Sequence, residues 1–294
     1  MFKIKYSFVC VLLVVLAAVG QGSTIDISSV GLWAGGTIEL GSNVSASGIA
    51  ASGGGFSASG GAALDSIYTE KNVWIGSGSA VSGDIIANSE IYASGVKVGG
   101  SVNQFSDFVL PELDILEKNT FGTDDIYGKN NSTTTLSAGD YKSLSFGRDT
   151  TLNLSSGEYN IQSFWMDRES TVNVDTSAGN VVLNIAGGFS TSKNVSFVNT
   201  GSGSLQINIF GQDFWLGRGS SLSAVLKVFG GNIGADSSVN LSGQLYATGN
   251  IWLGDYSQFS YTPAAEIPEP STLAFLAAAG FYCFTSKYRH PKHT

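Results

Sequence analysis

The sequence predicts an all-β protein whose strands form a parallel β-solenoid, and two features of the 294-residue chain support this. Small polar residues alternate with apolar ones over most of the chain, as in Thr151-Leu152-Asn153-Leu154, and a period of two is typical of strands. A short unit also recurs roughly every 20 residues, which favours stacked coils. A jelly roll or immunoglobulin-like sandwich would show strands but less self-similarity.

The repeated unit is an apolar residue, any residue, a second apolar residue, then Gly or a small polar residue, with another apolar residue at the ninth position. From residue 144 onward the units start at 144, 164, 189, 214, 231 and 251, which are 17 to 25 residues apart. Earlier units begin at Leu32 and Val73. We expect the first and third positions to point inward as ladders of the core, and Gly to serve the corners.

One segment departs from this pattern and predicts a short helix docked on the solenoid. Residues 110–118 have Pro near the start, acids in the first turn and Lys at the end. The predicted organisation is a signal peptide at 1–20, an irregular Gly/Ser-rich solenoid part at 21–104, a short helix or connector at 105–125, a regular β-solenoid at 126–262 and a sorting signal at 267–294.

The N-terminal residues predict export. Lys3 and Lys5 precede an apolar run from Phe8 to Val19, and the small residues before Gln21 fit the site that a signal peptidase reads. We therefore expect the mature protein to begin at Gln21.

The C-terminal residues predict a membrane segment within a sorting signal. The motif Pro268-Glu269-Pro270 precedes an apolar segment, residues 271–284, and a tail, residues 287–294, with the cations Lys287, Arg289 and Lys292. The apolar segment is 14 residues long, or about 21 Å as a helix, which is short for a bilayer core of roughly 30 Å. Snorkelling cations or local thinning of the bilayer would close the gap.

This three-part order resembles the PEP-CTERM sorting signal of gram-negative bacteria that secrete exopolysaccharide. The resemblance covers about a tenth of the chain. It implies an anchor in the membrane through the C-terminus, processing by an exosortase-type membrane protease, and release to the cell surface or extracellular matrix.

Composition excludes several classes of function. Without the two N-terminal lysines, the three C-terminal cations and Glu269, the chain has 10 Lys+Arg and 22 Asp+Glu, a net charge of −12, which disfavours nucleic acid. Both cysteines and both histidines lie in the terminal segments, at Cys10, Cys283, His290 and His293. The mature part therefore lacks the side chains for disulfides, the usual zinc sites and Ser-His-Asp triads, and we predict no metal, no cofactor and no catalytic residues.

The tryptophans are the candidate binding residues. All five occupy the second position of the unit, where strand alternation points a side chain outward. A row of indoles would offer a platform for sugar rings, burying apolar area and presenting an N–H donor. The alternative is that the indoles pack against the helix or against loops. The five candidate tryptophans are Trp33, Trp74, Trp165, Trp215 and Trp252.

The predicted function is therefore that of a non-enzymatic, exported surface or matrix protein associated with exopolysaccharide. The alternative is a carbohydrate-binding module that uses the Trp row. A polysaccharide lyase or glycoside hydrolase is less well supported, because Asp167-Arg168-Glu169 and Asp124-Asp125 are the candidate acids and neither fits a known motif. The Thr-X-Thr rows that ordering water on ice would require are absent from the sequence.

Overall fold

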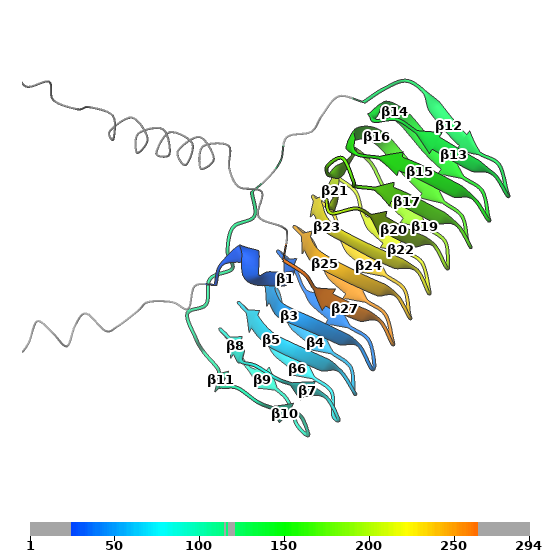
Figure 1. Cartoon of the computed structure of the whole chain (residues 1–294). Coiled ribbons are helices and arrows are strands. Elements are labelled where there is room, and N and C mark those ends of the chain that lie inside the picture. The colour runs from blue at the N-terminus through cyan, green and yellow to red at the C-terminus, as the bar shows by residue number, and fades with distance from the viewer. Residues whose placement is uncertain (1–24, 115, 117–120, 264–294) are drawn as a thin grey trace, which may run out of the picture. The chain divides into compact units, whose positions relative to one another are not determined.

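The computed structural model describes residues 25–114, 116 and 121–263, and these form a parallel β-solenoid (Figure 1). The described residues contain 27 strands and one 3-10 turn, Ile27–Ser29, and the pairings between the strands are parallel. The predicted solenoid is confirmed. The predicted signal peptide and C-terminal segment lie outside the described residues, and no helix among the described residues is long and apolar enough to span a membrane.

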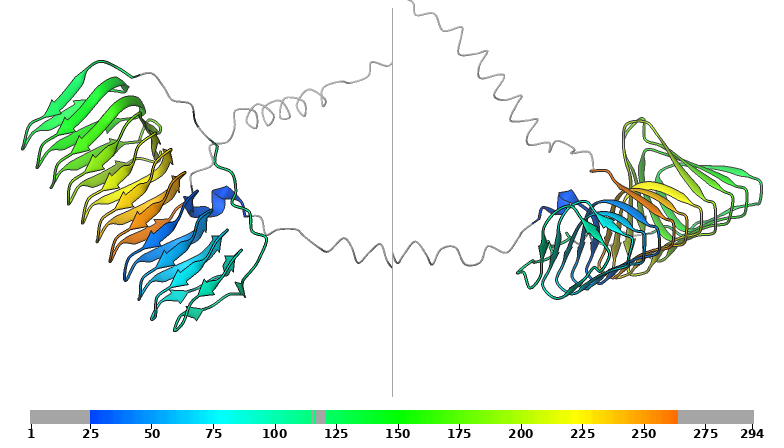
Figure 2. Two further views of the ribbon diagram at one scale, coloured as in Figure 1. Left: turned by 180° about the vertical axis from the view of Figure 1, so that it is seen from behind. Right: turned by 90° about the horizontal axis from the view of Figure 1, so that it is seen from below.

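Each coil contributes to three faces, here named A, B and C, and Figure 2 shows the stack from two further sides. Several strands turn a corner and serve two faces, so that β16 contributes residues 157–161 to face C and 164–166 to face A. Along the stack, face A holds β12 (Asp125–Gly128), the C-terminal parts of β14 (Gly139–Phe146) and β16 (Gly157–Met166), β19 (Phe189–Thr191), β22 (Phe214–Leu216), β24 (Ile233–Ala235), β26 (Ile251–Leu253), β2 (Ile38–Leu40), β4 (Phe56–Ala58), β6 (Val73–Ile75) and β9 (Ile91–Tyr92).

Faces B and C follow the same order. Face B holds β13 (Thr133–Leu136), β15 (Thr151–Ser155), β17 (Thr171–Asp175), β20 (Ser196–Thr200), the N-terminal parts of β23 (Ser221–Phe229) and β25 (Asn240–Ala247), β27 (Gln258–Tyr261), the N-terminal parts of β3 (Ser45–Ser52) and β5 (Ala63–Thr69), β7 (Ala80–Val81) and β10 (Lys97–Val98). Face C holds the N-terminal parts of β14 and β16, β18 (Val181–Ile185), β21 (Leu205–Phe210), the C-terminal parts of β23 and β25, β1 (Val30–Ala34), the C-terminal parts of β3 and β5, β8 (Ile85–Ala87) and β11 (Val102–Asn103).

The order of the coils in space differs from their order in the chain. The first coil lies in the middle of the stack, where β1 pairs with both β25 and β3, and β2 pairs with both β26 and β4. The chain builds outward from there to β11, crosses to β12 at the opposite end and builds back to β27, as the colours of Figure 1 show. Both ends of the described chain therefore lie at this central seam.

The core consists of ladders of inward side chains, as the repeat predicts. The first position of the unit forms a stack of phenylalanines in which the ring centroids of Phe164 and Phe189, and of Phe189 and Phe214, are 4.7 Å apart. Phe146 continues the stack with a centroid distance of 6.4 Å to Phe164. All four rings are fully buried, and each aromatic side chain removes a large apolar area from water.

The corner between faces A and B repeats one backbone conformation. The same turn position in each coil has a positive φ, between 55° and 76°. Asn, Asp and Gly tolerate this left-handed region best, which accounts for their frequency at the corners. The next residue is buried except in the two terminal coils, at Ser132 and Val96. Where this buried residue is Ser or Thr its hydroxyl bonds to the neighbouring coil, as when Thr150 N donates to Ser170 Oγ at 3.1 Å. The positive-φ residues are Asn131, Asp149, Glu169, Asn194, Gly219, Ser238, Tyr256, Asn43, Gly61, Gly78 and Gly95.

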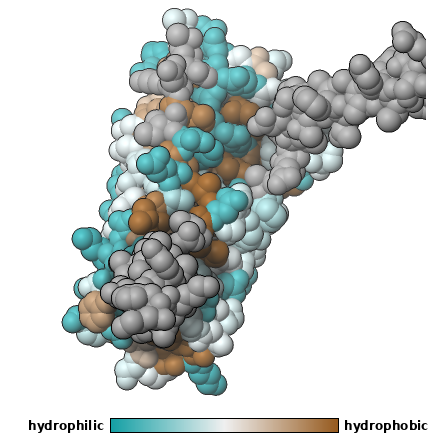
Figure 3. Space-filling model, turned by 90° about the vertical axis from the view of Figure 1, so that its left-hand side faces the viewer, coloured by the Kyte–Doolittle hydropathy of each residue, from teal (hydrophilic) through white to brown (hydrophobic). Residues whose placement is uncertain are grey.

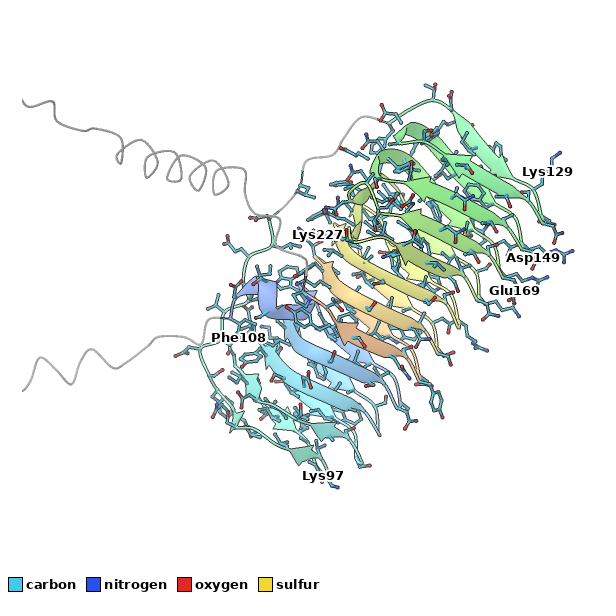
Figure 4. All side chains as sticks on the ribbon, in the orientation of Figure 1. Lys97, Phe108, Lys129, Asp149, Glu169 and Lys227 are labelled. Atoms are coloured by element: carbon cyan, nitrogen blue, oxygen red, sulfur yellow. The ribbon has the colours of Figure 1, made fainter. Side chains whose placement is uncertain are left out.

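The predicted helix is wrong for the described part of its range, because residues 110–114 form no helix. They belong to a segment, residues 104–114, that we call the strap and that runs along face C. Leu110 N donates to Glu70 Oε1 at 2.8 Å, and Pro111 O accepts from Trp33 Nε1 at 2.8 Å. Phe108 is buried, with its ring centroid 5.6 Å from that of Tyr68 (Figure 4). The solenoid thus supplies the bonds that a helix would have made internally.

Beside the strap, face C is apolar. The side of the molecule seen in Figure 3 carries apolar patches among hydrophilic residues. A small second core forms here from residues of β1, β3, β8, β25 and the strap, namely Val30, Trp33, Ala51, Ile86, Phe108 and Tyr246. The strap therefore covers apolar surface that would otherwise face water.

Tyr246 makes this seam sensitive to alkaline pH. Burial, with smaller effects from Tyr261 and Asp26, raises the pKa of Tyr246 far above its usual value near 10. Above about pH 10 the phenol ionises in the unfolded chain but stays neutral in the folded protein, so the stability present below about pH 10 is lost as the pH rises toward the higher folded-state pKa. We expect the Tm of the wild type to fall more steeply above about pH 10 than that of Tyr246→Phe. Parallel Tm curves for the two proteins would contradict this role.

Candidate functional site

Face A carries one continuous row of outward side chains that we call the aromatic row. The strand register aligns one residue from each coil, so that Trp215 pairs with Ser190 on one side and Gly234 on the other. Six of its eleven positions are aromatic, which makes the row the most distinctive surface of the described solenoid. In order along the stack the row is Tyr127, Ser145, Trp165, Ser190, Trp215, Gly234, Trp252, Glu39, Ser57, Trp74 and Tyr92.

The aromatic side chains of the row are exposed. The exposed fraction is smallest for Trp252, at 37%, and largest for Tyr127, at 70%. Ser or Gly separates the first four aromatic residues of the row, so the four lie on every second strand. With the usual strand spacing, the Cα atoms of successive aromatic residues are about 9.5 Å apart along the solenoid axis. The outward orientation that the sequence predicts is confirmed for Trp74, Trp165, Trp215 and Trp252.

Trp215 and Trp252 form a stacked pair at the centre of the row. Their ring centroids are 5.6 Å apart and their planes differ by 16°. The two rings approach over Gly234, where a Cβ atom would lie 2.4 Å from the indole of Trp215. Glycine at this position is therefore what allows the pair to form.

Substituting this glycine tests the pair without removing an indole. Gly234→Val is expected to push the indole of Trp215 away and to weaken the aromatic signal of the stacked pair in near-ultraviolet circular dichroism. Ser145→Val is the matched control, because Ser145 is also a small residue of the row but lies between Tyr127 and Trp165, neither of which belongs to the stacked pair. Equal spectra for Gly234→Val and the wild type would contradict the stacked arrangement.

Two shallow grooves flank the stacked pair. The first, about 420 Å³, is bordered by both indoles together with Glu39, Asp213 and Asn250. The second, about 440 Å³, lies on the other side of Trp252 and is bordered by Glu39, Arg218, Asp236 and Asp255 among others. Apolar rings and polar groups thus converge around Trp252, as is typical of ligand sites.

A ladder of one Asp and two Asn side chains fixes the wall of the first groove. Asp213 Oδ1 accepts from Asn232 N at 2.8 Å, Asn232 Oδ1 accepts from Asn250 N at 2.8 Å, and Asn250 Oδ1 accepts from Thr37 N at 2.8 Å. The indole N–H groups of Trp215 and Trp252 bond to no acceptor among the described residues. Both remain available to a ligand.

Trp33 does not belong to the aromatic row, and the prediction is wrong for this residue. It lies in β1 on face C, 6% exposed, beneath the strap to which its ring N–H is bonded. The residue of this coil that lies in the row is Glu39. The run Leu32-Trp33-Ala34-Gly35 has the composition of the unit but a different place in the coil.

The acidic candidates for catalysis do not form one site. Glu169 lies exposed at a corner (Figure 4), and the half-buried Asp167 accepts from Arg168 N through Oδ1 at 2.7 Å. Asp124 and Asp125 are exposed at the start of face A. Asp125 pairs with Lys142 at 3.1 Å. No group of three or more His, Cys, Asp or Glu among the described residues could hold a metal ion. Pro268, Glu269, Pro270 and the basic tail lie outside the described residues.

Face B carries a second regular surface that sequence reasoning missed. The register aligns Thr133, Thr151 and Thr171 in one row and Thr135, Asn153 and Asn173 in the row beside it, and Ser196 and Ser221 extend the first. Asn173 Nδ2 donates to Asn153 Oδ1 at 2.8 Å. Among these coils only β13 has Thr in both rows, so the two rows contain both hydroxyl and amide groups. The sequence shows no repeated Thr-X-Thr motif, and the alignment appears only from the strand register.

Comparison with known proteins finds only solved structures of low similarity to this chain. No family model matches the chain, and no curated protein matches it. Among solved structures, an ice-binding protein from the Antarctic ascomycete Antarctomyces psychrotrophicus is 16% identical, with 80% of this chain and 95% of that chain covered and a TM-score of 0.36. An ice-binding protein from an Antarctic bacterium of the Flavobacteriaceae is 12% identical, with 81% and 83% covered and a TM-score of 0.27. Scores this low say nothing about what this chain binds.

Proposed function

We propose that this protein is a non-enzymatic, exported polysaccharide-binding protein and that the aromatic row of face A is its binding surface. The single observation that supports this is the alignment of six exposed aromatic residues in one row along the solenoid. Sugar rings present apolar C–H faces that pack on indole and phenol rings, while ring N–H and hydroxyl groups bond to sugar oxygens.

The length of the row favours a polymer over a single sugar. Rings that repeat along one axis offer several weak contacts in series, and a chain that occupies several of them binds much more tightly than any contact alone. The grooves beside the stacked pair are shallow, which suits a chain lying along the surface. An exposed apolar row of this size also calls for a ligand or partner, since it would otherwise promote aggregation.

The terminal segments support a place outside the cell. The proposal is that the signal peptide directs export and that the PEP-CTERM-like segment holds the chain in the membrane until an exosortase-type protease releases it to an exopolysaccharide matrix. Because both ends of the described chain lie at the central seam, such a tether would hold the solenoid by its middle.

The test of this function uses the full-length protein purified in detergent. It is applied to a panel of insoluble and soluble polysaccharides, and retention is measured by co-sedimentation and affinity electrophoresis. We expect retention by at least one polysaccharide that presents unsubstituted sugar faces. Absence of retention across the panel, for protein that unfolds cooperatively, would contradict the proposal.

Face B supports a second candidate, the ordering of water at an ice surface. The supporting observation is the two adjacent rows of hydroxyl and amide groups, repeated about every 4.8 Å by the strand spacing. Thermal hysteresis measured for the wild type and for Thr151→Lys tests it. Hysteresis that disappears in the variant would favour face B, and no hysteresis in the wild type would remove this candidate.

A further inference from the structure

We propose that Glu39 is the specificity-determining residue of the aromatic row, and that it selects an amino-sugar polymer with free ammonium groups. This inference rests on the proposed polysaccharide-binding function. Glu39 lies in the row itself, between Trp252 and Ser57, and is exposed. It is the one charged side chain among the eleven positions.

Glu39 borders both grooves and so lies where a polymer must pass. It lines the groove beside the stacked pair and also the groove on the far side of Trp252. A polymer that followed the row from Trp215 to Trp74 would pass over the carboxylate of Glu39. A carboxylate next to an indole suits an ammonium group, which is attracted both by the charge and by the face of the ring.

The other carboxylates of the grooves have structural partners, whereas Glu39 has none. Asp213 accepts from Asn232, Asp255 Oδ1 accepts from Ser42 N at 2.6 Å, and Asp236 Oδ1 accepts from Ser237 N at 2.7 Å. The carboxylate of Glu39 forms no hydrogen bond or ion pair with any of the described residues, although its backbone belongs to the strand ladder. Its carboxylate is thus free to bind a ligand, and its removal costs the fold nothing that the structure shows.

The charge around the row favours the same ligand. The two grooves are bordered by four carboxylates and a single guanidinium, that of Arg218. Carboxylates that border the same groove repel one another, and a cationic ligand relieves that repulsion whereas a neutral one does not. A uronic acid polymer would be repelled. The combination of rings and carboxylates therefore distinguishes between glycans of the same shape by their charge.

The test compares oligomers of glucosamine with fully N-acetylated oligomers of the same length, at mildly acidic pH and low salt. The two ligands share a backbone and differ in the ammonium group. We expect the full-length wild type to bind the free-amine oligomer at least about tenfold more tightly, with the difference shrinking as salt screens the charges. Glu39→Gln is expected to abolish this difference between the two oligomers. Asp149→Asn, at a corner outside both grooves, is the control for a general charge effect (Figure 4).

The outcomes separate this inference from the proposed function. Equal affinities for the two oligomers in the wild type, or a difference that Glu39→Gln leaves intact, would overturn the role of Glu39 while the aromatic row stands. A fall in solubility as the sole effect of Glu39→Gln would also overturn it, since the carboxylate would then only keep the exposed row in solution. Failure to bind either oligomer or any other polysaccharide would contradict the proposed function itself.

Discussion

Replacing Trp33 by alanine is expected to lower the free energy of unfolding by about 3–5 kcal/mol, the range for truncating a large buried aromatic side chain. The indole fills the space between the strap and β1, and its loss leaves a cavity and an unpaired carbonyl at Pro111. In the strand register Trp33 also lies opposite Tyr246 of β25 on one side and Ala51 of β3 on the other. The substitution therefore weakens the place where the two halves of the chain meet.

The matched control is Trp74→Ala, which removes the same side chain from an exposed place. Because Trp74 is 52% exposed, we expect its removal to change the free energy of unfolding by about 0.5 kcal/mol or less. Denaturant unfolding of both variants measures the contrast. Similar losses of stability for the two would mean that Trp33 is not buried beneath the strap.

Replacing Trp215 and Trp252 together by alanine is expected to weaken polysaccharide binding about 100-fold, if the stacked pair as a unit contributes about 2.8 kcal/mol to the free energy of binding. The loss of stability should stay below about 1.5 kcal/mol, since the exposed pair stacks mainly on itself. The single variants should not be additive, because either substitution also removes the ring that orients the other.

Measurement of affinity and stability on the same samples separates the two effects. Ser190→Ala is the control, since it changes the row between two indoles without removing a ring. Unchanged affinity of the double variant for a polysaccharide that the wild type binds would place the binding surface elsewhere, and face B would be the next surface to test.

The sequence predicts the local part of this fold well. The period of two identifies the strands, and the unit that begins at Leu144 or Phe214 correctly assigns inward and outward positions, because both are consequences of side-chain alternation within one strand. The outward tryptophans of face A follow from the same argument.

The long-range part could not be predicted from the repeat. Glu39 and Trp252 are neighbours although 213 positions separate them, and nothing in either coil specifies that the last coil pairs with the first. For the same reason Trp33 was misplaced, since its neighbours in sequence match the unit and only its partners in space reveal face C. The prediction of a helix at residues 110–118 fails where the strap is described, because Pro and flanking charges also suit an irregular segment whose bonds go to the solenoid.

The central claim is that the exposed aromatic row of face A binds polysaccharide, and quenching of tryptophan fluorescence by acrylamide tests it most directly. Trp33 is buried and gives a constant background, so any change reports the four outward indoles. We predict that a polysaccharide which retains the protein also shields these indoles and lowers the quenching constant in a saturable way. Retention of the polysaccharide with an unchanged quenching constant would contradict the claim.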